Sequence, residues 1–158
     1  MLIVKKEILY LIFVCYIVGL FNLVLVTKNF WNTIWHNIFY NFNENPFEGI
    51  FDFSYNFIPT IYKIIIGEYT LDSWGKAMIV GNFLMFIPMG ILLSLCLENV
   101  NKKNIFKYAV LIPLAIEVLQ LVVGRSFDID DLVMNFLGIV IGYYLVKLIK
   151  KLKIFNKC

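Results

Sequence analysis

Four long apolar runs dominate this sequence, and they restrict the chain to one class of fold. An α-helix needs about 20 residues to cross the hydrocarbon core of a bilayer. Because lipid offers no hydrogen-bond partners to the backbone, only helices and closed barrels span it. Runs of this length predict an all-α integral membrane bundle of four transmembrane helices. They cover Ile8–Val26, Ala77–Leu97, Tyr108–Val123 and Leu132–Ile149.

The composition agrees with a membrane protein. The chain is 61% hydrophobic and 16% charged, whereas soluble domains are nearer half apolar and a quarter charged. A chain of 158 residues predicts one domain, residues 1–158. The third run is short, and we expect its helix to borrow Ile105–Lys107 to reach a spanning length. The net charge of +3 is too small to predict nucleic-acid binding.

The lysines predict the orientation of the bundle. They precede the first run, separate the second run from the third, and close the chain, whereas segment 27–76 carries more acids than lysines. The positive-inside rule places lysine-rich segments in the cytoplasm. We therefore expect both termini to be cytoplasmic and segment 27–76 to be external. Within that segment, Ile58–Ile66 predicts a short interfacial helix with Pro59 in its first turn.

With this topology, polar side chains from three helices come to one depth near the outer surface. A charged group within a membrane span costs free energy and usually has a function. We predict that seven residues form a ligand-binding site: Asn82, Glu117, Gln120, Arg125, Asp128, Asp131 and Asn135.

Helical spacing supports this shared site. Glu117 and Gln120 lie three residues apart and so share one face of their helix. On the last run, Asn135 lies on the same stripe as Gly138 and Gly142. A Gly-xxx-Gly pair allows a neighbouring helix to approach closely. The stripe should therefore face the bundle interior.

Arg125 is the only arginine among fourteen basic residues. A guanidinium can hold a carboxylate or a phosphate with two parallel hydrogen bonds. It could pair internally with Glu117 or an aspartate, or hold a lipid phosphate or another anionic ligand. Asp128, Asp130 and Asp131 could cap the last helix, although one cap hardly needs three carboxylates.

The sequence predicts neither a cofactor nor a metal site. His36 is the only histidine, and the three cysteines lack metal-ligand or redox spacing. The acids near Glu117 could hold a divalent cation, but no complete set of protein ligands is visible. Catalytic residues stay unassigned. The candidates are Glu117, as a general acid or base, together with Asp128 and Asp131.

Four blocks occur in an order and spacing that point to one family: Asn56–Pro59, Gly81–Gly90, Glu117–Gln120 and Gly124–Tyr143. Together they resemble the VanZ-like family, small membrane proteins associated with teicoplanin resistance. The likeness is strongest over residues 56–149, and residues 1–55 do not add to it. It implies a multi-pass protein of the bacterial cell membrane that lowers susceptibility to glycopeptide antibiotics. It does not supply a mechanism.

The sequence is compatible with three functions. The first, which the sequence favours, is a non-catalytic protein whose outward-facing polar pocket binds a lipid headgroup, a lipid-linked cell-wall precursor or a glycopeptide. The second is a membrane-embedded enzyme that modifies a lipid-linked envelope substrate. The third is a helix-packing partner of another membrane protein. The expected partners are membrane lipids and one of these ligands, with no nucleic acid.

Overall fold

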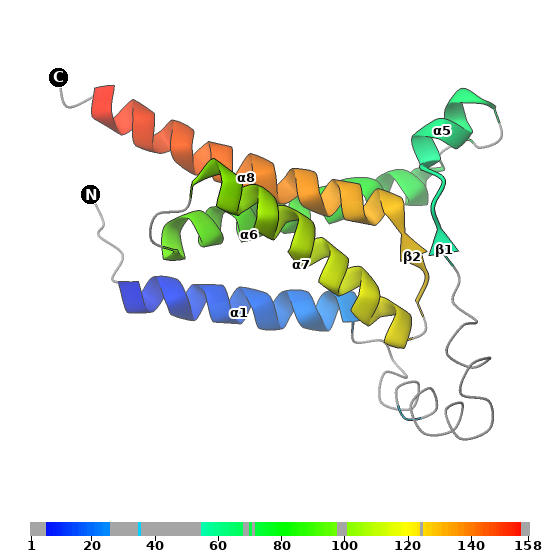
Figure 1. Ribbon diagram of the computed structural model, residues 1–158, viewed down its shortest axis with the longest axis horizontal. Helices are drawn as coiled ribbons and strands as arrows, with labels where there is room; N and C mark the ends of the chain where they lie inside the picture. The colour runs from blue at the N-terminus through cyan, green and yellow to red at the C-terminus, as the bar shows by residue number, and fades with distance from the viewer. Residues whose placement is uncertain are drawn as a thin grey trace.

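The computed structural model describes residues 6–25, 35, 55–67, 70, 72–97, 101–123 and 125–155. Within them, four helices are long and apolar enough to cross a membrane: α1 (Lys6–Leu25), α6 (Ser73–Cys96), α7 (Lys102–Val122) and α8 (Ile129–Phe155). The predicted all-α membrane bundle is confirmed. Figure 1 shows the start of α1 and the end of α8 at one end of the bundle, as an even number of spans requires.

The third span begins earlier than its apolar run predicts. The run covers Tyr108–Val123, and borrowing Ile105–Lys107 was expected to complete it, but α7 begins at Lys102. The side chain of Asn101 accepts a hydrogen bond from the backbone N–H of Asn104 at 2.8 Å, which satisfies a free N–H at the helix start. The lysines after this cap therefore extend the helix to 21 residues, enough to cross the hydrocarbon core.

Glycines allow α6 and α8 to pack with their backbones nearly in contact. A Cβ added at Gly142 would lie 2.2 Å from the carbonyl oxygen of Ile87, and one added at Gly138 would lie 2.5 Å from that of Phe83. A Cβ at Gly90 of α6 would lie 2.0 Å from a backbone oxygen of α8. The small-residue stripe of α8 thus faces the bundle interior, as its spacing predicts.

Two tyrosines connect α1 to α6. The hydroxyl of Tyr10 donates to the carbonyl oxygen of Cys96 at 3.0 Å, and that of Tyr16 donates to the carbonyl oxygen of Met85 at 2.7 Å. A hydroxyl without a partner is costly in an apolar medium. These bonds therefore fix the rotation of α1 about its axis.

The opposite end of the bundle carries a structure that the sequence did not predict. Strand β1 (Tyr55–Asn56) pairs in parallel with β2 (Phe127–Asp128), the segment that leads into α8. Helix α5 (Thr60–Ile65) follows β1 (Figure 1).

The predicted helix over Ile58–Ile66 therefore exists, but Pro59 is its N-cap and does not lie in the first turn. Ile65 is 76% exposed, and the interfacial position of this helix stays a prediction. Most of the predicted external segment, 27–76, lies outside the described residues.

Candidate functional site: a polar cavity between four helices

A cavity of about 290 Å³ is formed by the final part of α1, the first half of α6, the final part of α7 with Arg125 beyond it, and the start of α8. Six of the seven predicted ligand-binding residues line it: Asn82, Glu117, Gln120, Arg125, Asp131 and Asn135. The seventh, Asp128, is not part of the lining, but its backbone N–H donates to Oε2 of Glu117 at 3.0 Å. The remaining wall is apolar or small, and includes Leu23, Val24, Gly81, Met85 and Phe86.

Three polar residues of this cavity are almost fully buried. Glu117 is 1% exposed, Asn135 is 3% and Gln120 is 4%. Among the described residues, Oε1 of Glu117 and Oδ1 of Asn135 have no hydrogen-bond partner. A buried acceptor left in this state costs about 1–3 kcal/mol, so it calls for an explanation. Both residues line the cavity, so the two acceptors without a described partner belong to its wall.

Arg125 contacts a carbonyl oxygen near the end of α1. Its Nη1 donates to the carbonyl oxygen of Val24 at 2.7 Å, and Nε2 of Gln120 approaches the same oxygen at 3.5 Å. The last carbonyls of a helix lack intrahelical partners, and a cation there is favourable for the helix dipole. Within the described part of the chain, the hydrogen bond of this guanidinium goes to a carbonyl and not to a carboxylate. Arg125 therefore fastens α1 to the bundle while it lines the cavity.

The three aspartates at the start of α8 have three different contacts. Oδ1 of Asp128 accepts from the backbone N–H of Asp130 at 2.9 Å and so caps the helix. The carboxylate of Asp130 accepts from the backbone N–H of Thr60 at 2.9 Å, which holds the start of α5. Asp131 accepts from Nδ2 of Asn82 on α6. Capping thus accounts for one carboxylate only, in agreement with the sequence argument.

Sequence reasoning missed two polar residues at this end of the bundle. Nζ of Lys63 donates to Oδ1 of Asn56 at 2.8 Å, and Nδ2 of Asn56 donates to Asp128 at 3.3 Å. The β-pair places Asn56 opposite Asp128. Together with the contact between Asp128 and Glu117, these bonds connect α5 to the cavity wall. The available signal was the position of Asn56 in the first of the four sequence blocks.

The polar side chains of the lining can form hydrogen bonds and ion pairs. Its described polar residues are amides, two carboxylates and a guanidinium, which bind through hydrogen bonds and charge. Of the three catalytic candidates, Glu117 and Asp131 line the cavity, whereas Asp128 is occupied as a helix cap. Within the described residues, no group of three or more His, Cys, Asp or Glu side chains is placed to hold a metal ion.

Comparison with known proteins agrees with this architecture. The family described as VanZ/LLP1 matches residues 8–150. The match runs from α1 into α8, so it includes the first span as well as the region where the sequence likeness was strongest. The chain matches no curated protein and no solved structure. With most of its length matched and four helices suited to crossing a membrane, the chain belongs to the VanZ/LLP1 family.

Proposed function

We propose that this protein lowers the susceptibility of a bacterial cell to glycopeptide or lipoglycopeptide antibiotics by holding the polar part of an envelope molecule in its polar cavity. The bound group is a lipid headgroup, a lipid-linked cell-wall precursor or the drug itself. One observation carries the binding role: Glu117 and Asn135 are buried, line the cavity, and each leaves an acceptor oxygen without a partner in the described structure.

The placement of the cavity supports a role at the outer surface. Its walls come from the end of α1 and the start of α8, away from the lysine-rich chain ends. The positive-inside rule assigns those chain ends to the cytoplasm. The cavity would then open toward the side from which glycopeptides arrive, and a ligand held there would limit access of the drug to the membrane surface.

Antibiotic susceptibility tests the proposal directly. The wild-type protein and its variants are expressed at matched membrane levels in a susceptible Gram-positive host, and the minimal inhibitory concentration of teicoplanin is measured. Wild type should raise it, whereas Glu117→Ala and Arg125→Ala should return it to the level of the empty vector. Glu7→Ala and Lys103→Ala remove an acid and a base that do not line the cavity, and should protect like wild type.

Two results would reject this function. The first is a wild-type protein that gives no protection when it is correctly inserted. The second is full protection by both Glu117→Ala and Arg125→Ala. Gel filtration in detergent shows whether each variant is folded, and Glu117→Gln, which keeps the shape of the side chain, separates loss of the charge from loss of the fold.

A second function, catalysis on a lipid-linked envelope substrate, is supported by the state of Glu117. One of its oxygens accepts from Asp128, and the other lacks a partner in the described structure and belongs to a cavity-lining side chain. A general acid or base must come within hydrogen-bond reach of its substrate, and this oxygen is buried in the cavity wall. Lipid and precursor profiles of cells with wild type and with Glu117→Gln test this function. Identical profiles would count against catalysis.

A further inference from the structure

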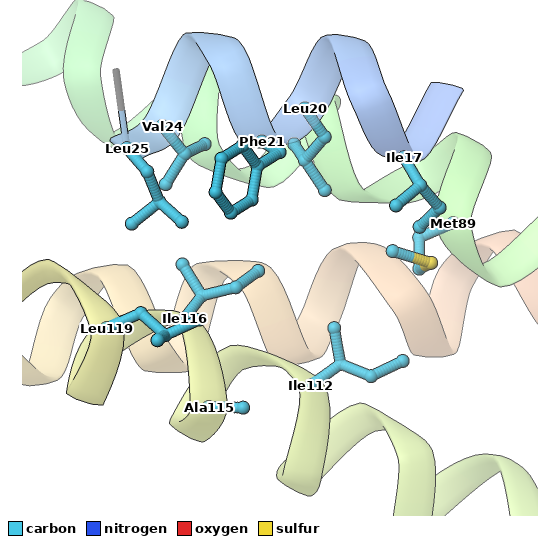
Figure 2. Close-up of a pocket in the computed structure, with 10 residues that line it drawn as sticks. All are labelled: Ile17, Leu20, Phe21, Val24, Leu25, Met89, Ile112, Ala115, Ile116 and Leu119. Carbon is cyan, nitrogen blue, oxygen red and sulfur yellow. The ribbon is translucent and has the colours of Figure 1, made fainter. Parts of the chain in front are cut away.

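An apolar cavity of about 210 Å³ lies next to the polar one. Figure 2 shows its walls: side chains of α1 and α7 face each other across it, and Met89 of α6 lies at one side. The lining residues are all apolar, and they include Val24, Ala115, Ile116 and Leu119. We call this space the α1–α7 groove.

The groove and the polar cavity share a wall. Val24 lines both, and its carbonyl oxygen is the acceptor that Arg125 holds. On α7, Ile116 lines the groove while the next residue, Glu117, lines the polar cavity. Successive helix residues point about 100° apart, so α7 turns an apolar face to one space and a polar face to the other. An apolar space and a polar space thus lie side by side at Val24.

We infer that the ligand is a lipid with hydrogen-bond donors in its headgroup, which lies in the polar cavity while an acyl chain lies in the α1–α7 groove. The inference rests on the function proposed above and names the class of ligand. Donors are required because the two buried atoms without described partners, Oε1 of Glu117 and Oδ1 of Asn135, are acceptors. Arg125 adds a positive charge to a wall that also carries the carboxylates of Glu117 and Asp131, so the guanidinium suits a lipid phosphate and the carboxylates suit the headgroup donors.

The polar cavity measures about 290 Å³ and the groove about 210 Å³. The groove can therefore hold only part of an acyl chain, and the remaining tail of the lipid stays in the bilayer. In a bilayer, an acyl chain gains little by leaving other acyl chains for an apolar groove. Selectivity among lipids must therefore come from the headgroup, and the groove only fixes the position of the acyl chain.

Photolabelling of the purified full-length protein in vesicles tests this assignment. The probes are phosphatidylglycerol, phosphatidylethanolamine and phosphatidylcholine, each with a diazirine in one acyl chain. All three carry a phosphate, but only the first two have headgroup donors, hydroxyls in one and an ammonium in the other. We expect one or both to label groove peptides of α1 and α7 several-fold more than phosphatidylcholine does. The better probe identifies the preferred donor.

Two variants of α7 test whether the acyl chain lies in the groove. Ala115→Phe fills the groove and should reduce the selective labelling to the level of phosphatidylcholine. Val118→Phe adds the same bulk at a position that is 51% exposed and does not line the groove, so labelling should stay as in wild type. A photoreactive amino acid in place of Leu119 tests other occupants. It should crosslink to lipid.

Several outcomes would overturn the inference: equal labelling by all three probes, unchanged labelling in Ala115→Phe, or crosslinks from position 119 to a second copy of the chain or to residues 26–54. These results are separable from failure of the proposed function. Equal labelling combined with loss of protection in Glu117→Ala rejects the lipid but keeps the function. Selective labelling combined with full protection in Glu117→Ala and Arg125→Ala keeps the lipid but rejects the function.

Discussion

Replacing Gly142 by alanine should destabilise the bundle, because the new methyl group has no space. Its Cβ would lie 2.2 Å from the carbonyl oxygen of Ile87 and 2.9 Å from the backbone nitrogen of Ile91. Both atoms belong to the backbone of α6, so no side chain can rotate away. The two helices must therefore separate along the interface that also holds Asn82 against Asp131.

The expected size of the effect follows from two opposing contributions. Overpacking a tight interior costs about 1–3 kcal/mol, and a contact with rigid backbone belongs at the upper end of that range. Alanine is favoured over glycine inside a helix by roughly 1 kcal/mol. The net loss in the free energy of unfolding should then be about 2 kcal/mol.

A matched control is available in α1. Gly19 also lies inside a long helix, but a Cβ added there would meet nothing within 4 Å. Gly19→Ala should therefore leave the free energy of unfolding unchanged or raise it by up to about 1 kcal/mol. Reversible unfolding in bicelles, followed by steric trapping, measures both variants. If Gly142→Ala were as stable as Gly19→Ala, the close packing of α6 on α8 would be refuted.

Three further predictions concern the polar end of the bundle. Asn82→Asp should place two carboxylates together and lower the free energy of unfolding by about 1–3 kcal/mol, and adding Asp131→Asn should restore most of this loss. A double-mutant cycle that shows no coupling between the two positions would contradict the contact. Arg125→Ala should cost about 1.5–3 kcal/mol, because it removes a charged hydrogen bond to the carbonyl of Val24, and chemical denaturation that gives wild-type stability would exclude that bond. A cysteine at Ser126, in a background whose native cysteines are serine, should react with an impermeant thiol reagent added outside intact cells; labelling only after lysis would reverse the predicted orientation.

Much of the site could be predicted from the sequence because the membrane restricts where polar residues can lie. Once four spans are assigned, the depth of Asn82, Glu117 and Asn135 follows from their positions along the runs. Their meeting in one cavity was therefore foreseeable from the spans and from helical spacing. The start of α7 was harder to predict, since three lysines beside an apolar run are typical of a loop until a cap such as Asn101 is recognised.

The sequence could not predict the hydrogen bonds that hold this end of the bundle together. Arg125 bonds to the carbonyl of Val24, 101 residues earlier, and Asn56 bonds to Asp128, 72 residues later. A backbone carbonyl carries no sequence signal. A strand of two residues is too short to show a period of alternation.

The amino-acid order alone determined the class of fold, the four helices suited to crossing a membrane and the positions of the polar groups along them, because a lipid interior tolerates few arrangements of a backbone and few positions for a charge. The tertiary structure decided which polar atoms are satisfied and which are not. Glu117 and Asn135 are left with acceptors that have no described partner, next to an apolar groove. That combination depends on how closely the helices pack and at what rotation, which the glycine contacts between α6 and α8 and the tyrosine and Arg125 contacts of α1 help to fix.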